Sequence, residues 1–364
     1  MDEKIKELTL EIDSISSSIN NKKKINIMEV CGTHTMSIAK NSLQQLLPEK
    51  INLVSGPGCP VCVTPTSDID IIIEIIKKYD ITTFTFGDMM RVPGTLSSLM
   101  IEKSKGKDIR VCYNPLDALS FAEDNKNKNV LLIAIGFETT TPITAVILKK
   151  AFEKNIDNLY IYATHKIIPP AIDALLSDPL IEIDAFMLPG HVSVIIGTEP
   201  FKFISTKYKK ACSVAGFDPY NILLSIKNIL LQIKNDDFFI DIAYKGIVKK
   251  EGNIFAVKLI NEVFEVCSTQ WRGLGILPDS GLCLKEDYRR FDSKTKFPVG
   301  KIISKEIKGC ECASILKGLK NPLECRMFSS VCTPDNPLGP CMVSSEGSCS
   351  AYFRYKRFND RSAV

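Results

Sequence analysis

The chain has 364 residues, of which 45% are hydrophobic and 24% charged, and its formal net charge is +4. This length suits two or three domains, and the composition is that of a folded globular protein and not of a disordered or fibrous one. The lysine run at 22–24 is too short to predict a nucleic-acid interface, and no apolar run reaches the roughly 18 residues of a membrane span.

The N-terminal segment MDEKIKELTLEIDSISSSIN predicts an amphipathic helix, because Ile5, Leu8, Ile12 and Ile15 recur at helical spacing. It lacks the apolar stretch of a signal peptide, so we expect a cytoplasmic protein. Disulfides are rare in that compartment. The 13 cysteines are therefore better candidates for metal or redox chemistry than for structural cross-links.

From about residue 25, short apolar runs alternate with amphipathic segments, which predicts parallel sheet covered by helices on both faces. A first run of strands is expected at 25–30, 51–55, 81–86 and 109–113, with helices at 38–47, 67–79, 95–103 and 115–125. A second run of strands is expected at 130–135, 159–163, 185–188 and 211–214, with helices at 142–154, 170–176, 192–197 and 220–234.

The predicted fold class is therefore α/β, with two similar Rossmann-like units at 25–127 and 128–235 that face each other across a cleft. After about residue 236 the strand-like pieces become less regular, and most of the cysteines follow. We expect residues 236–364 to form a third, cysteine-rich domain that carries an iron–sulfur cluster. The N-terminal helix within 1–24 is expected to pack on this third domain.

Chemically versatile side chains follow the predicted strands, and in open α/β sheets ligands bind beyond the carboxyl ends of the strands. The set comprises Cys31, His34, Cys59, Cys62, Asp88, Arg91, Glu138, Thr139, His165, Lys166 and His191. It includes all three histidines of the chain. Helix capping is the alternative role for Asp88 and Glu138. Cys112 and Cys212, inside predicted strands, are expected to be core residues.

Cys59 and Cys62 form a C-x-x-C pair in an α/β context, which indicates a redox or metal role. The spacing allows two thiolates to meet on one turn, so it suits either a reversible disulfide or chelation of one metal. His34 stands three residues after Cys31 and suits either a ligand or an ordinary hydrogen-bonding residue.

The C-terminal cysteines lie on loops rich in Pro, Gly and Ser, which is typical of iron–sulfur sites. A zinc site is the competing interpretation, but zinc favours closer pairs of ligands. We therefore expect a [4Fe–4S] cluster. The preferred ligands are Cys325, Cys332, Cys341 and Cys349, with Cys310 and Cys312 as alternates or as a nearby redox pair.

Several strings together resemble the HypD family of [NiFe] hydrogenase maturation factors. They are CGTHT at 31–35, GPGCPVC at 56–62, TFGDMMRVPG at 85–94, GFETT at 136–140, PGHVS at 189–193 and the tail 310–355 with CMVSSEGSC. The tail departs from the family pattern at Ala313 and in CRMFSS at 325–330, and neither departure removes a candidate ligand.

The resemblance implies a scaffold that forms a complex with the small chaperone HypC. On that complex an iron atom acquires its cyanide and carbonyl ligands before delivery to the hydrogenase large subunit. HypE supplies the cyanide as a thiocyanate, and HypF supplies its precursor. By this similarity Cys31 is the iron ligand, shared with a HypC cysteine, and His34 lies next to it. Cys59 and Cys62 are the redox pair.

The resemblance also places Asp88, Glu138 and His191 in the same predicted cleft. In this scheme the dithiol supplies two electrons for cleaving the thiocyanate, and the cluster domain recharges it. We expect His34 or strand-end amides to lower the pKa of the reactive thiols. Two other functions are considered: a stand-alone iron–sulfur-dependent thiol/disulfide oxidoreductase, and a zinc-stabilised interaction protein.

Overall fold

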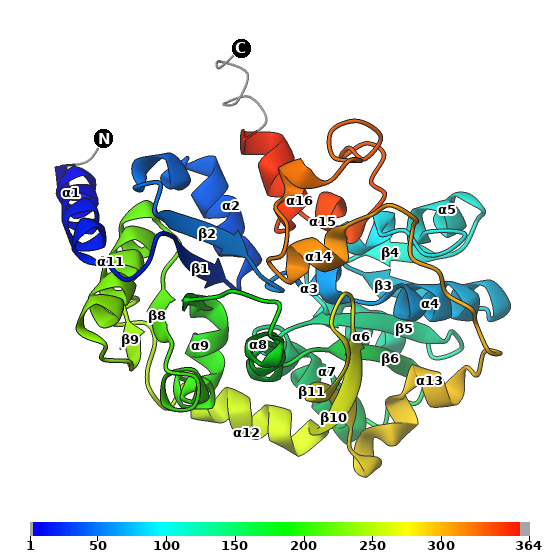
Figure 1. Cartoon of the computed structure of the whole chain (residues 1–364). Coiled ribbons are helices and arrows are strands. Elements are labelled where there is room, and N and C mark those ends of the chain that lie inside the picture. The colour runs from blue at the N-terminus through cyan, green and yellow to red at the C-terminus, as the bar shows by residue number, and fades with distance from the viewer. Residues whose placement is uncertain (1–2, 357–364) are drawn as a thin grey trace.

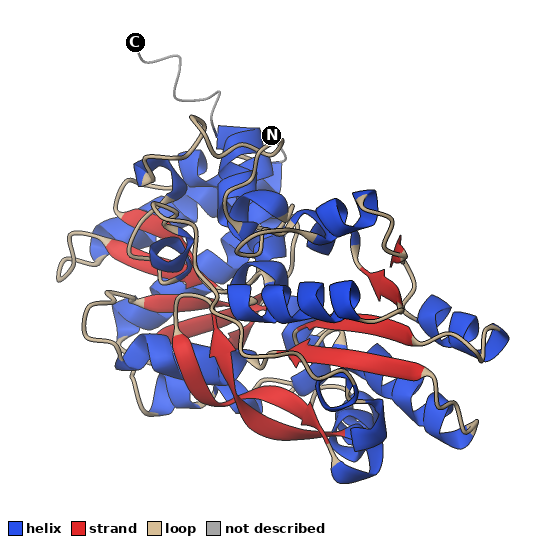
Figure 2. Cartoon of the chain, turned by 90° about the vertical axis from the view of Figure 1, so that its right-hand side faces the viewer, coloured by secondary structure: helices blue, strands red, loops and turns tan. Residues whose placement is uncertain are grey.

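The computed structural model describes residues 3–356 and has an α/β fold with two parallel sheets and a separate antiparallel hairpin (Figure 1). All eight expected strands are present close to their predicted bounds. Figure 2 shows these strands in red between layers of helices. Sequence periodicity therefore predicted the α/β class and the parallel strands correctly.

The first sheet has the strand order β2-β1-β7-β8-β9 and is parallel throughout. Its strands are β1 (Ile25–Glu29), β2 (Ile51–Ser55), β7 (Ala185–Pro189), β8 (Ala211–Ala215) and β9 (Ile240–Ile242). The second sheet has the order β4-β3-β5-β6 and is also parallel. Its strands are β3 (Thr82–Thr85), β4 (Ile109–Val111), β5 (Val130–Gly136) and β6 (Leu159–His165).

The grouping of strands differs from the two successive four-strand units expected from chain order. β1 and β2 pair in one sheet with the later strands β7–β9, whereas β3 and β4 pair with β5 and β6. The expected grouping, which divided the strands near residue 127, is therefore wrong. Strands buried on both faces read as uniform apolar runs, and such runs carry no signal of which sheet each strand joins.

The longer helices flank the sheets; α11, for example, packs on β7 and β8, and α6 on β5 and β6. Their bounds are α1 (Glu3–Ser18), α2 (Gly32–Lys40), α4 (Thr66–Lys78), α5 (Leu99–Ser104), α6 (Leu116–Asp124), α7 (Thr141–Glu153), α8 (Ile168–Ser177), α9 (Gly190–Ile196), α11 (Pro219–Asn235) and α12 (Ile254–Val263). Shorter helices are α3 (Pro60–Val63), α10 (Phe203–Thr206), α13 (Ser293–Lys296), α14 (Cys312–Leu316), α15 (Pro340–Val343) and α16 (Ser348–Ala351).

Helix α1 lies against α11 of the first sheet and not on the cysteine-rich segment, where it was expected. Its buried residues Leu8 and Ile12 belong to the same apolar cluster as Ile222 and Ile226 of α11, and Glu11 pairs with Lys227. The sequence did not predict this packing partner, because the apolar stripe of α1 shows that one face is buried but not which element covers it.

The remaining chain consists of the β10–β11 hairpin and a largely irregular tail. β10 (Phe264–Trp271) and β11 (Gly275–Leu284) are antiparallel. In the tail, α15 packs on α3 and α16 packs on α2, so residues 340–351 return to the end of the molecule where β1 and β2 terminate (Figure 1). Within residues 3–356, no helix combines the length and the apolar character needed to cross a bilayer.

Candidate functional site

Cys31 and the C-x-x-C loop lie next to each other at the carboxyl ends of β1 and β2. Cys31 is the N-cap residue of α2, and the amide of Gly32 donates a hydrogen bond to the carbonyl of Gly58 (3.0 Å). A Cβ atom at Gly58 would lie 2.2 Å from the backbone nitrogen of Cys31. Only glycine therefore permits this approach, which brings two sequence-predicted motifs together.

Cys59 and Cys62 are joined by a disulfide at the start of α3, with a Cα–Cα distance of 5.2 Å. Both are buried, and the amide of Cys62 donates to the sulfur of Cys59 (3.2 Å). Helix α3 packs on β5 of the second sheet and on α15 of the tail. The Cys59–Cys62 pair thus lies where both sheets and the tail meet.

The tail covers Cys31 through polar contacts that short-range sequence patterns do not reveal. Thr33 donates to Glu346 (2.8 Å), and the Ser344 hydroxyl donates to Asp88 (2.9 Å). Arg91 donates to the carbonyl of Pro334 (2.8 Å). Asp88 is therefore engaged with the tail and does not act as the N-cap of a helix. Glu346 was missed because only the cysteines of CMVSSEGSC were considered as candidates.

Burial dominates the acidity of Cys31. It raises the pKa of this thiol to about 12, with the carboxylates of Glu346 and Glu29 acting in the same direction. The amides of Thr33 and His34 oppose this shift but do not overcome it. The net direction is opposite to the expected one, so a metal ion that bound Cys31 would have to displace the thiol proton.

The structure brings His34 and His191 together around Phe217, a residue that the sequence did not suggest. His34 is fully buried; its Nε2 donates to the carbonyl of Gly216 (3.0 Å), and its ring stacks on Phe217 at 4.9 Å. The exposed ring of His191 stacks on Phe217 at 4.0 Å. Burial lowers the pKa of His34 to about 4, so this imidazole is neutral at physiological pH.

Glu138 is buried, and its Oε1 accepts the amide proton of Ile168 (3.0 Å) at the start of α8. It does not cap α7, the helix that follows it in the chain. Within residues 3–356 its second oxygen has no hydrogen-bond partner, and burial raises the pKa of Glu138 to about 7. Glu138 therefore exchanges a proton near neutral pH, which suits a group that handles protons at a site.

Two other strand-end residues serve local structure. His165 is buried against Thr144 (3.1 Å), and the amine of Lys166 donates to Thr269 and to the carbonyl of Gln270 (both 2.8 Å). Cys112 and Cys212 are buried core residues, as expected.

Several C-terminal cysteines converge on one small cavity, whose other lining residues are apolar except for Glu311. Its sulfur-bearing residues are Cys310, Cys312, Cys325, Cys332, Cys349, Met327 and Met342. Cys341 does not line it; this residue is fully buried in α15. Three of the four preferred ligands therefore share the cavity with both alternates.

The donor set of this cavity fits a thiolate-bound cluster. The amide of Leu338 donates to the sulfur of Cys332 (3.4 Å), and a Cβ at Gly339 would lie within 2.7 Å of the sulfurs of Cys310 and Cys312. In the described part of the chain, no three His, Cys, Asp or Glu side chains are placed to hold a single metal ion. Thiolates around a cavity suit a multi-iron cluster better than a single ion.

A further disulfide, between Cys267 and Cys283, was not anticipated. It joins the two strands of the hairpin and lies outside the cavity. The expected reducing compartment argued against such a bond, and a separation of 16 residues gave no pairing signal before the hairpin was known.

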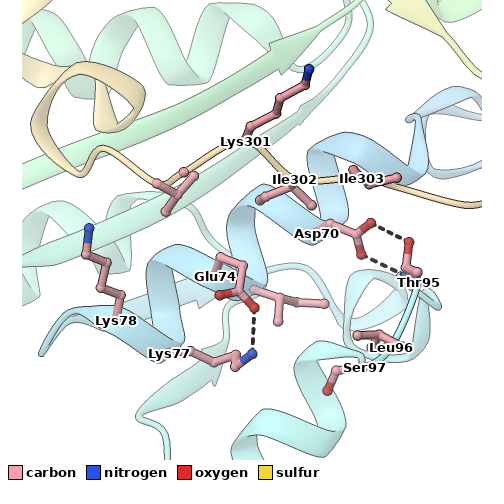
Figure 3. Close-up of a pocket in the computed structure, with 13 residues that line it drawn as sticks. Asp70, Glu74, Lys77, Lys78, Thr95, Leu96, Ser97, Lys301, Ile302 and Ile303 are labelled. Atoms are coloured by element: carbon pink, nitrogen blue, oxygen red, sulfur yellow. Dashed lines mark hydrogen bonds and ion pairs between the residues drawn. The ribbon is translucent and has the colours of Figure 1, made fainter.

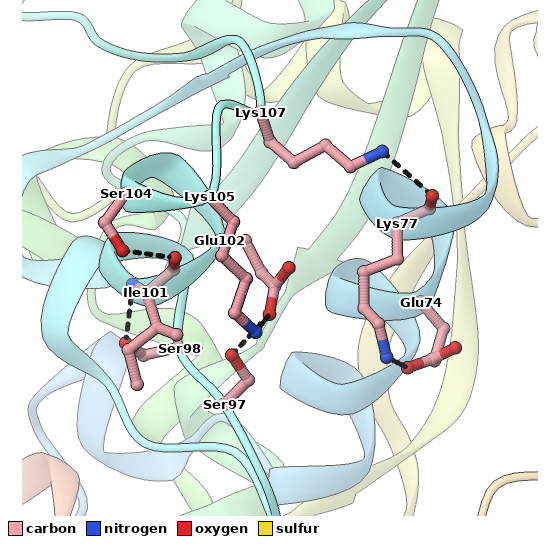
Figure 4. Close-up of polar contacts among 9 residues, drawn as sticks. All are labelled: Glu74, Lys77, Ser97, Ser98, Ile101, Glu102, Ser104, Lys105 and Lys107. Carbon is pink, nitrogen blue, oxygen red and sulfur yellow. Dashed lines mark hydrogen bonds and ion pairs between the residues drawn. The ribbon is translucent and has the colours of Figure 1, made fainter.

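Besides a cavity of about 750 Å³ along α12, two cavities of about 400 Å³ each are larger than the cysteine-lined one, and no cysteine lines them. One is lined by α4 and the segment 299–303, where Asp70 accepts hydrogen bonds from Thr95 and Glu74 pairs with Lys77 (Figure 3). Nearby, Glu102 accepts from Ser97 and Lys105 (Figure 4). Neither cavity contains a cysteine or histidine, so the chemistry points to the cysteine sites despite their smaller volume.

Comparison with known proteins bears on the whole chain. Residues 3–356 match the family model described as "HypD: Hydrogenase formation hypA family". Proteins named hydrogenase maturation factor HypD are 40% identical in Cupriavidus necator, 42% in Rhodobacter capsulatus and 39% in Escherichia coli. These alignments cover 92% to 93% of this chain and 90% to 91% of the relatives. The chain therefore belongs to the HypD family of hydrogenase maturation factors.

Proposed function

We propose that this protein is the scaffold on which an iron atom receives cyanide and carbonyl ligands during maturation of a [NiFe] hydrogenase. The observation that carries the proposal is the contact between Gly58 and Cys31, which holds a candidate iron ligand against a redox-active pair. A scaffold of this kind needs an iron-binding thiolate and a source of electrons within one site.

In this proposal Cys31 binds the cargo iron, together with a cysteine of HypC. Thiolate suits soft, low-valent iron complexes. Because the pKa of Cys31 is raised to about 12, iron displaces the thiol proton on binding. Asp88 holds the tail over this position through its hydrogen bond from Ser344. Neutral His34 and His191, which both stack on Phe217, form the neighbouring wall.

Cys59 and Cys62 supply the two electrons that release cyanide from a thiocyanate delivered by HypE. The dithiol becomes a disulfide, the carbon–sulfur bond of the thiocyanate breaks, and the products are a thiol and hydrogen cyanide. Two electrons and two protons pass from the pair to the products, so the step is balanced. Glu138, with a pKa of about 7, is the candidate for moving protons near α3.

We propose that the cysteine-lined cavity holds a [4Fe–4S] cluster. Cys325, Cys332 and Cys349 are the preferred ligands, and the cavity lining favours Cys310 or Cys312 as the fourth in place of Cys341. Such a cluster supplies electron transfer when bound. Cys341 belongs to α15, which packs on α3, and the next residue, Met342, lines the cavity.

The remaining parts of the proposal concern partners and location. HypC and HypE act on the complex directly, HypF acts earlier by supplying the cyanide precursor, and the hydrogenase large subunit receives the product. We propose a cytoplasmic location. Neither nucleic acid nor a membrane has a role.

The function is tested by hydrogenase maturation in cells that carry single variants. We expect Cys31→Ala, Cys59→Ala and Cys62→Ala each to abolish active hydrogenase, while Cys112→Ala, a buried cysteine outside the site, retains it. Intact maturation in the Cys59→Ala and Cys62→Ala strains would remove the redox role. Co-purification of HypC with each variant separates loss of chemistry from loss of the complex.

The cluster is tested by iron and acid-labile sulfide content of anaerobically purified protein. We expect about four irons and four sulfides per chain, lost in Cys332→Ala and retained in Cys341→Ala. Colourless wild-type protein that contains zinc and resists reconstitution would instead support the zinc-stabilised interaction protein.

A second candidate function is a stand-alone thiol/disulfide oxidoreductase, which the packing of α3 against the cysteine-rich tail also accommodates. It predicts reduction of disulfides in unrelated partner proteins and no requirement for Cys31. Loss of maturation in Cys31→Ala with disulfide reduction unchanged would favour the scaffold.

A further inference from the structure

The disulfide between Cys267 and Cys283 lies on an element that the proposed function does not use. In the hairpin register, Cys267 faces Gly281 and Cys283 faces Glu265, so the two cysteines are diagonal neighbours on one face. Their Cα atoms are 6.0 Å apart, within the range that disulfides span. Gly281 has no side chain opposite Cys267, which leaves the sulfur free to reach across.

Exposure distinguishes this pair from the one at the candidate site. Cys283 is exposed and Cys267 is half-buried, whereas Cys59 is 3% exposed and Cys62 is fully buried. Thiol–disulfide exchange requires the attacking sulfur to reach the disulfide in line, so access governs its rate. A small thiol in solution therefore reaches the hairpin pair before it reaches the buried pair.

The far end of β10 contacts the segment that carries Cys62. The amide of Arg272, the residue after β10, donates to the carbonyl of Val63 (2.8 Å), and its guanidinium donates to the carbonyl of Thr64 (3.0 Å) and to Thr66 (2.9 Å). Trp271 is buried and stacks on Phe137. The hairpin thus supports the C-terminal end of α3 directly.

The same hairpin is fixed from the second sheet near its middle. Lys166, the residue after β6, donates to Thr269 and to the carbonyl of Gln270, and the amide of Ile167 donates to the carbonyl of Ser280 (2.9 Å). Between Cys267 and Thr269 the register shifts by a bulge. The disulfide therefore closes the hairpin just beyond an irregular point, where strand pairing is weakest.

We propose that Cys267 and Cys283 form a second reversible thiol–disulfide site, which takes small thiols and disulfides and controls how firmly the hairpin holds α3. Oxidation transfers two electrons to a low-molecular-weight disulfide. The Cys283 thiolate displaces one thiol from it to give a mixed disulfide, and Cys267 then displaces the second. Both protons leave with the thiols formed. Reduction by two such thiols reverses the step.

The site itself is tested on the full-length Cys59→Ser/Cys62→Ser protein, poised at graded ratios of reduced and oxidised glutathione and then alkylated for mass spectrometry. We expect the 267–283 disulfide to form and disappear across this range. With Cys267→Ser added, Cys283 should carry glutathione instead. Two unlinked thiols at every ratio, or a disulfide that persists at the most reducing ratio, would overturn a reversible site.

The coupling to α3 is tested by amide hydrogen exchange, with Cys59–Cys62 kept oxidised in all samples. Replacing Cys267 and Cys283 by serine should speed exchange in the peptide spanning 60–66 on the order of tenfold, the change that about 1.4 kcal/mol produces. The exposed neighbour Ser268→Ala is the matched control and should leave this peptide unchanged. Equal exchange in the serine variant and the wild type would overturn the coupling, whatever the first measurement shows.

Discussion

At the scale of single residues, Arg272 connects several parts of the molecule. Its buried guanidinium bonds to Thr64 and Thr66 and pairs with Glu306, an exposed residue of the tail. The hydrogen bond with Cys312 and burial raise the pKa of Cys310 in the cysteine-lined cavity, and the charge of Arg272 opposes this rise without overcoming it. Arg272 thus contacts the segment that follows Cys62 and also influences the cysteine-lined cavity.

We expect Arg272→Gln to lower the free energy of unfolding by roughly 1–3 kcal/mol, because it leaves a buried carbonyl and hydroxyl without their donor. Arg272→Lys should recover only part of this loss, since an ammonium cannot reproduce the fork of the guanidinium. Chemical denaturation of the purified protein measures both. The exposed Arg289→Gln, whose ion pair is on the surface, should stay close to wild type. Equal stability of Arg272→Gln and Arg289→Gln would contradict this account.

A second residue-scale prediction concerns pH. Burial lowers the pKa of His165 to about 4, against a usual value of 6.5. The unfolded chain therefore binds the proton first, and stability present above pH 6.5 falls as pH decreases towards 4. At pH 5 the loss is about 2 kcal/mol relative to pH 7.

Denaturation at pH 7 and pH 5 tests this directly. The difference in unfolding free energy between the two pH values should be smaller by about 2 kcal/mol in His165→Gln than in the wild type. Exposed His191→Gln serves as the comparison; burial lowers the pKa of His191 as well, so this variant should change the difference in the same direction but by less. An unchanged pH dependence in His165→Gln would mean that His165 does not carry the effect.

At the scale of elements, local pattern predicted what depends on a strand's own residues. Uniform apolar runs gave β5 and β6 correctly, and helical spacing gave α1 and α11. The β10–β11 hairpin was missed because β10 mixes exposed and buried residues without strict alternation and contains a bulge. The helical turn α3 was missed because its four residues, which begin at Pro60, are too few to show a helical periodicity.

The hairpin disulfide leads to an element-scale prediction about stability. Reduction removes a cross-link that closes a loop of about 15 residues, which should cost about 3 kcal/mol of unfolding free energy. Denaturation with and without a reductant measures the loss in a background lacking Cys59 and Cys62. The Cys267→Ser/Cys283→Ser protein should be insensitive to the reductant. If it responds as strongly as its parent, the effect comes from other cysteines.

At the scale of the whole molecule, the candidate site draws on both sheets and the tail. Cys31, Cys59 and Cys62 could be found from sequence because their motifs are local. Glu346, Phe217 and Arg272 could not, since they meet Thr33, His34 and Thr64, respectively, across about 180 to 310 positions of the chain. Contacts between residues so far apart in the chain depend on the topology. The alternation of apolar and amphipathic segments did not predict which sheet each strand joins.

One apolar cluster runs through all these parts. It includes Phe186 of the first sheet, Leu131 of the second, Met342 of the tail and Trp271 of the hairpin. We therefore expect the sheets to unfold together. The fluorescence of Trp271, the only tryptophan, and far-ultraviolet circular dichroism should share one midpoint.

Phe186→Ala sharpens this test, because Phe186 is fully buried in a sheet that does not contain Trp271. It should cost about 3–5 kcal/mol and shift both signals equally. A shift of circular dichroism alone, with the tryptophan midpoint unmoved, would show that the sheets unfold independently.

The strand order also has a consequence for how the chain acquires its structure during synthesis. The second sheet is built from one uninterrupted stretch, 82–165, so all its strands are available early. β1 precedes this sheet in the chain, yet its partner β7 follows β1 by about 160 residues. During synthesis, β1 can therefore pair only with β2 until β7 has been made. The second sheet, whose strands all lie between β2 and β7 in the chain, can form before then. In pulse-labelled refolding, the amides of Val130–Gly136 should be protected from hydrogen exchange before those of Ile25–Glu29. The contacts that surround Cys31 should form last.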